Sequence, residues 1–137
     1  MADWYGTSRT NMVYIDNLDG LKESLEPFDI TIDEREDGSV LFSSRETCNG
    51  DFPAFGSTDE DEELEFSWEE HVMPFVKEGE VLIVMSSGAV KYHYVTGYAD
   101  AYVRKGTDVQ SVGLDLNHIY DLASEKLGIF PRTRAEY

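Results

Sequence analysis

The stretch from Val81 to Leu114 constrains the fold of this 137-residue chain more than any other segment. Four short apolar, β-branched and aromatic runs follow one another there, separated by turn-forming residues. Short turns join antiparallel neighbours, whereas parallel strands need crossover connections of a dozen or more residues. We therefore expect an antiparallel meander of about four strands. The expected strands are 81–85, 90–95, 97–104 and 109–114, with turns at 86–88 and 105–108.

The N-terminal part of the chain predicts a strand, a helix and a β-hairpin. Asn11–Ile15 is apolar and β-rich, and residues 18–25 carry leucines at the i, i+3, i+7 spacing of a helix that ends before Pro27. Apolar and polar residues alternate over Phe28–Asp33, the period of a half-buried strand. The Asp37-Gly38 step then favours a tight turn into a returning strand over 40–42.

The middle of the chain predicts a loop followed by a helix. Residues 44–63 lack periodicity and contain turn-forming residues, so we expect a long surface loop. Ser67 and Glu70 match a capping box, in which the hydroxyl and the carboxylate each accept from a backbone N–H at the start of a helix. That helix is expected over 68–77, with an interruption at Pro74.

A last helix is expected over residues 116–127, with Asp115 at its start and Gly128 at its end. Helices segregated from a meander in this way indicate an α+β fold rather than a doubly wound nucleotide-binding fold. The expected architecture is one domain over residues 1–137, a mainly antiparallel sheet with two to three short helices packed on one face.

Charge is distributed very unevenly along the chain. The 28 Asp and Glu residues against 11 Lys and Arg give a formal net charge of −17. Residues 1–80 contain 22 acidic and 5 basic residues, whereas residues 81–137 contain 6 of each. All of the net charge therefore lies in the first part, where two acidic clusters occur at 33–37 and 59–70.

Such an acidic surface repels nucleic acid and anionic membranes. Like charges crowded together also lower folding stability, so each cluster is either a solvated surface or a binding surface for a cationic partner. The second interpretation assigns partner binding to a defined set of carboxylates. They are Asp33, Glu34, Glu36, Asp37, Asp59, Glu60, Asp61, Glu62, Glu63, Glu65, Glu69 and Glu70.

The sequence contains no recognisable catalytic, cofactor or metal motif. Glycine-rich phosphate loops and the G-x-S-x-G nucleophile elbow are absent. His71, His93 and His118 stand too far apart for paired metal-ligand spacing. Cys48 has acidic neighbours that would raise its thiol pKa, so it is a poor nucleophile. We accordingly predict no catalytic residues, no metal and no cofactor.

Compartment and solubility follow from similar observations. A single cysteine allows no internal disulfide, and the first twenty residues contain three aspartates and no signal-type apolar run. The longest apolar run is Val81–Met85, whereas a membrane span needs roughly 20 residues. We expect a soluble cytoplasmic protein that does not bind membranes.

Three segments resemble small acidic proteins of bacterial plasmids and phages. They are Ala2–Asn11 (ADWYGTSRTN), Glu78–Val81 (EGEV) and Arg132–Tyr137 (RTRAEY). Many acidic proteins of such mobile elements are DNA mimics, antirestriction and anti-CRISPR inhibitors that occupy the basic nucleic-acid groove of a host defence complex. The resemblance covers most of the chain, includes no catalytic motif and assigns no role to individual residues.

Charge and resemblance together predict a non-enzymatic DNA-mimic-like inhibitor. Its partner would be a basic nucleic-acid-binding protein or nuclease complex, without direct contact to nucleic acid. One alternative is an acidic immunity or antitoxin protein that neutralises a specific basic toxin through a few hot spots. Another is a small enzyme with a site in residues 81–137, using His93 and a tyrosine. The sequence predicts no oligomeric state.

Overall fold

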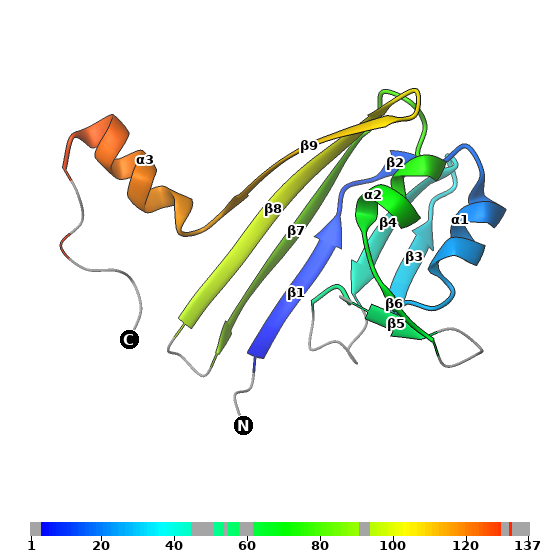
Figure 1. Cartoon of the computed structure of the whole chain (residues 1–137), viewed down its shortest axis with the longest axis horizontal. Helices are drawn as coiled ribbons and strands as arrows, with labels where there is room; N and C mark the ends of the chain where they lie inside the picture. The colour runs from blue at the N-terminus through cyan, green and yellow to red at the C-terminus, as the bar shows by residue number, and fades with distance from the viewer. Residues whose placement is uncertain are drawn as a thin grey trace.

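The computed structural model describes residues 4–44, 51–53, 55–57, 62–90, 94–129 and 132. Seven strands form one antiparallel sheet: β1 (Trp4–Thr10), β2 (Val13–Tyr14), β3 (Ile30–Glu34), β4 (Ser39–Ser44), β7 (Val81–Val90), β8 (Tyr94–Lys105) and β9 (Asp108–Asp115). Their order is β2–β4–β1–β7–β8–β9, and β3 also pairs with β4 (Figure 1). A separate hairpin consists of β5 (Phe55–Ser57) and β6 (Glu63–Glu65).

Three α-helices accompany the sheet, which confirms the predicted α+β class. They are α1 (Leu18–Leu25), α2 (Trp68–His71), which is followed by a 3₁₀ helix at Met73–Phe75, and α3 (His118–Leu127). Figure 1 shows α1, α2 and the β5–β6 hairpin gathered around β2, β3 and β4, while α3 lies beyond the opposite end of the molecule.

The hydrophobic core lies between α1, α2 and one face of the sheet. Trp68 is at its centre, with its ring 4.8 Å from that of Phe52, 5.0 Å from Phe66 and 5.7 Å from Phe42, all edge to face. Burying large aromatic and aliphatic side chains is the main driving force for folding. The other buried members are Val13, Leu21, Leu25, Phe28, Ile30, Val40, Val72, Met73, Val76, Leu82 and Val84.

Local sequence signals correctly predicted α1 and the β3–β4 hairpin. The Asn17 side chain caps α1 by accepting from the backbone N–H of Gly20, and Leu21 and Leu25 are buried. Gly38 has φ +90°, a left-handed conformation that favours glycine in a tight turn. Only local backbone geometry is needed at both places, which is why the sequence pattern suffices.

The predicted turn at Ser86–Gly88 is wrong, because β7 runs through it without interruption. Ser86 is buried, and its hydroxyl accepts a hydrogen bond from Ser8 Oγ at 2.7 Å, so a turn-like composition is compatible with a central strand. Likewise, β8 runs from Tyr94 to Lys105 without interruption, so residues 94–95 and 97–104, expected in two strands, belong to one. The segment 91–93 between β7 and β8 lies outside the described residues.

The expected loop at 44–63 is also wrong in part. Residues 45–50, 54 and 58–61 lie outside the described residues, but Phe55–Ser57 forms β5 and pairs with β6. Phe52, from the same segment, is buried in the core. Hairpin formation here was not predictable because each strand is only three residues long, too short for an alternating pattern to be distinguished from a loop.

Two further expectations need correction. The strand predicted at Asn11–Ile15 is limited to β2, and the preceding strand β1 was not predicted. The helix predicted over 68–77 ends at His71, and Pro74 lies in the 3₁₀ helix that follows. Ser67 Oγ accepts from Glu70 N as a capping box requires, but Ser67 N donates to His71 Nδ1 instead of the Glu70 carboxylate.

The last helix begins and ends close to where the sequence predicts. Asp115 Oδ1 accepts from His118 N at 3.2 Å, and Gly128 ends the helix at φ +72°. None of the residues of α3 is buried, so this helix is not one of the two to three that the prediction packs on the sheet. Only α1 and α2 therefore cover the sheet, on one face.

Candidate functional site

The first predicted acidic cluster occupies the end of β3 and the turn to β4, and its four carboxylates are exposed. Asp33 and Glu34 form ion pairs with Arg35 (3.4 Å) and Lys22 (3.2 Å). Asp37 Oδ1 accepts from Ser39 Oγ and Ser39 N, and these two hydrogen bonds lower the pKa of Asp37. Glu36, the fourth member, is exposed in the turn.

The second predicted cluster occupies the β6–α2 region. Asp59, Glu60 and Asp61 lie outside the described residues. The remaining members, Glu62, Glu63, Glu65, Glu69 and Glu70, are all exposed, on or beside β6 and in the first turn of α2. Acidic residues in a first helical turn also interact favourably with the helix dipole, so Glu69 and Glu70 have a structural role as well.

The structure places the first cluster and the β6 part of the second cluster at opposite ends of β3, whereas Glu69 and Glu70 lie on α2, where the charge of Glu69 acts on Tyr102 of β8. The β5–β6 hairpin lies beside the start of this strand, where Ser57 N donates to Pro27 O. The first cluster lies at its other end, about 13 Å further along at the usual rise per strand residue. Figure 1 shows the same separation, with β5 and β6 at one end of β3 and the turn to β4 at the other. The predicted carboxylates thus form two acidic surfaces.

A groove between α1 and β3 adds carboxylates that the sequence did not single out. Glu23, Glu26 and Asp29 line it together with Lys22. Its floor is apolar, formed by Leu25, Phe28, Ile30 and Ile32, and its volume is about 460 Å³. We call it the α1–β3 groove. These residues are scattered in sequence, and only the packing of the helix against the strand brings them together.

A separate polar cluster surrounds Asp51, next to the core residue Phe52. Asp51 Oδ1 accepts from Phe52 N (2.8 Å), Ser86 Oγ (3.2 Å) and Tyr98 OH (3.2 Å), and Ser8 Oγ, which donates to Ser86 Oγ, lies 3.4 Å from it. One carboxylate oxygen thereby joins β1, β7 and β8 to the segment that inserts Phe52 into the core. Sequence patterns missed this cluster because the side chains that hydrogen-bond to one another in it are 35 to 78 residues apart along the chain.

A cavity of about 390 Å³ adjoins this cluster and is lined by Asp51, Ser86 and Tyr98 among others. Burial, followed by the nearby Asp51 charge and hydrogen bond, raises the pKa of Tyr98. At neutral pH the phenol is therefore a hydrogen-bond donor and not an anionic nucleophile. Among the described residues, neither serine hydroxyl contacts a histidine, and their hydrogen bonds run to each other and to the Asp51 carboxylate.

Raising the pH should reveal the raised pKa of the Tyr98 phenol in the stability of the protein. Its folded-state pKa exceeds the value of about 10 for a free tyrosine, so the unfolded chain loses this proton first. The free energy of unfolding should consequently fall as the pH rises above about 10, by up to about 1.4 kcal/mol per pH unit for this group. Urea unfolding of the wild type and Tyr98→Phe between about pH 7 and 11 measures it.

Below about pH 9 the two proteins should differ by a constant amount, and above that pH the gap should shrink. Equal pH slopes above about pH 10 would show that the phenol titrates normally.

The three histidines and the single cysteine are the remaining candidate residues. His71 packs against the rings of Phe28 and Phe66, and His118 is exposed at the start of α3. His93 and Cys48 lie outside the described residues. The residues that the structure describes contain no group of three or more His, Cys, Asp or Glu placed to hold a metal ion.

Among the residues that the structure describes, no helix has the length and apolar character needed to cross a membrane.

Comparisons of the chain with protein-family models, with curated proteins and with solved structures gave no match.

Proposed function

We propose that this chain is a non-enzymatic, DNA-mimic-like inhibitor that binds a basic nucleic-acid-binding protein of a host defence system in the cytoplasm. The observation that carries the proposal is the row of carboxylates along β3. The two acidic surfaces lie at its ends, and the carboxylates of the α1–β3 groove lie between them. The whole row lies within residues 1–80, the half of the chain that carries the net charge of −17.

The spacing of the carboxylates suits a protein that normally binds DNA. Alternate residues of a strand are roughly 6.6 Å apart, close to the two-phosphate step of a DNA strand at about 3.4 Å per phosphate. The α1–β3 groove is suited to a lysine or arginine, because its apolar floor can cover the aliphatic stem while Glu23, Glu26 and Asp29 receive the charged head. Binding should weaken as salt increases.

Competition with duplex DNA for a panel of basic DNA-binding proteins and defence nucleases tests the proposal. We expect the chain to displace DNA, and Glu63→Gln, Glu65→Gln and Glu69→Gln together to weaken displacement about tenfold. A matched control removes three exposed charges from the neutral half, through Asp108→Asn, Asp121→Asn and Glu125→Gln. The control has the same net charge as the test variant and should compete like the wild type.

Failure of the chain to displace DNA from every protein in the panel would refute the proposal. So would equal losses in the test and control variants, because these would show that total charge matters and position does not.

The localised α1–β3 groove favours a second candidate, an acidic immunity or antitoxin protein. A specific interface concentrates its binding energy in a few residues, whereas a broad mimic distributes it. Neutralising Glu23 and Glu26 should then abolish binding to a toxin while the changes at Glu63, Glu65 and Glu69 have little effect. Similar small losses from every set favour the mimic.

A further inference from the structure

The face of β7–β9 opposite the core is apolar and uncovered in the part of the chain that the structure describes. Cross-strand pairing aligns its residues in rows, Met85–Ala99–Leu114 and Ile83–Ala101–Val112. Met85, Leu114 and Val112 are 56%, 55% and 72% exposed. The middle strand contributes only alanine methyl groups to these rows, while both flanking strands contribute larger side chains. A shallow apolar groove, the β8 groove, therefore runs along β8.

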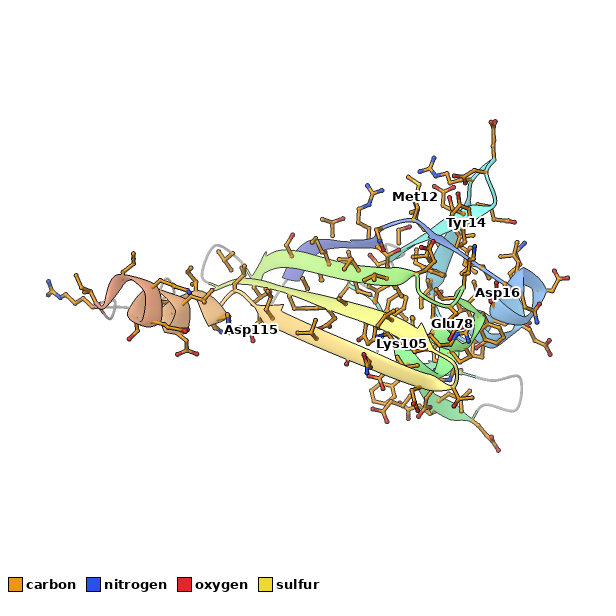
Figure 2. All side chains as sticks on the ribbon, turned by 90° about the horizontal axis from the view of Figure 1, so that it is seen from above. Met12, Tyr14, Asp16, Glu78, Lys105 and Asp115 are labelled. Atoms are coloured by element: carbon orange, nitrogen blue, oxygen red, sulfur yellow. The ribbon has the colours of Figure 1, made fainter. Side chains whose placement is uncertain are left out.

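The helix α3 has an apolar stripe and no surface to pack against. Ile119, Ala123 and Leu127 follow helical spacing, and Ile119 and Leu127 are 59% and 74% exposed. Leu116 precedes the helix and lies beside Gly97, at the end of the β8 groove of its own chain. Figures 1 and 2 both show α3 beyond the end of the sheet. A helix of 10 residues is marginally stable alone in water, so its stability depends on packing this stripe against another surface.

Charge determines where two copies of this chain can meet. Residues 1–80 carry the full net charge of −17, so contact through that half brings like charges together. Residues 81–137 are neutral. Among the described residues, nine of the twelve large hydrophobic side chains that are exposed lie between Val81 and Ile129. The apolar surface thus coincides with the half that a second copy can approach without repulsion.

We propose that the chain forms a two-fold symmetric dimer in which α3 of each copy packs into the β8 groove of the other. The dimensions agree: the stripe from Ile119 to Leu127 spans about 12 Å along the helix, and β8 from Ala99 to Val103 spans about 13 Å. Two-fold symmetry makes the contact reciprocal, so both unpartnered surfaces of both copies are buried at once. The acidic surfaces remain outside the contact, and the proposal is independent of the inhibitor function.

Light scattering coupled to size exclusion, in about 1 M NaCl where the Debye length is about 3 Å, tests the dimer. We expect twice the 15.5 kDa mass of the chain. Ala101→Glu places a charge in the β8 groove, and Leu127→Asp places one in the helix stripe. Each should halve the measured mass. As a control, Met12→Asp places a charge on an apolar side chain that is 51% exposed in the acidic half, and it should leave the dimer intact.

Mixing the two variants tests the exchange of helices itself. The Ala101→Glu copy keeps an intact helix and the Leu127→Asp copy an intact groove, so a mixture restores one of the two contacts. We expect the mixture to dimerise at concentrations where each variant alone is monomeric. A monomeric wild type, a dimer that persists in both variants, or a mixture that stays monomeric would overturn the proposal.

Discussion

Replacing Trp68 with Ala should lower the free energy of unfolding by about 3–5 kcal/mol, the usual cost of deleting a large buried aromatic side chain. Trp68 is 8% exposed and contacts three aromatic rings, from β4, from the Asp51 segment and from the residue that follows β6. Its removal leaves a cavity that borders several segments at once, so the structure cannot close it by a local shift. Urea unfolding followed by circular dichroism measures the loss.

Phe55→Ala is the matched control, because that aromatic side chain is 56% exposed on β5. It should cost less than about 1 kcal/mol. A similarly small loss for Trp68→Ala would show that the aromatic cluster is not the centre of the core.

Replacing Arg104 with Met should lower the free energy of unfolding by about 2–3 kcal/mol. The Arg104 side chain is only 18% exposed, and its guanidinium donates to Val76 O at 2.9 and 3.1 Å and to Gly106 O at 2.9 Å. It also pairs with Asp16. Figure 2 shows Asp16, Glu78 and Lys105, from three separate segments, at this same end of the sheet. Methionine leaves these carbonyl groups without their charged donor.

Arg104→Lys should recover only part of the loss, because one ammonium group cannot reach two carbonyls in the geometry of the planar guanidinium. Lys22→Met removes an exposed ion pair with Glu34 and should cost no more than about 1 kcal/mol. Equal losses for Arg104→Met and Lys22→Met in thermal or urea unfolding would contradict the role given to Arg104.

Sequence patterns predicted the elements whose signals are local. Helix α1 has both its Asn17 cap and its leucine spacing within nine residues. The turns at Gly38 and Gly106 need only a left-handed glycine. The class of the fold followed because short turns force antiparallel pairing.

Features that depend on distant partners were missed. β1 and the middle of β7 contain serine and glycine, and glycine in particular disfavours a strand interior on composition alone. Their buried hydroxyls are satisfied across the sheet, where Ser8 bonds to Ser86 over a separation of 78 residues. No local pattern reports such a partner, and a buried polar group without one is costly.

The candidate site shows the same limit. The exposure of the acidic residues was predictable, because unpaired charges are rarely buried. Their arrangement was not, since it depends on β5 packing beside Pro27 and on α1 lying against β3. The sequence therefore identified the acidic residues but neither the separation of the clusters nor the α1–β3 groove between them.

The position of β1 determines when this chain can fold during its synthesis. β1 pairs with β4 on one side and with β7 on the other, so its pairing is complete only once Val81–Val90 has also been made. Contacts between such distant segments slow folding, because the long intervening loop must close before they form. The acidic half therefore emerges without the strand that completes its sheet, and β1 lacks one of its two neighbours until β7 has been made.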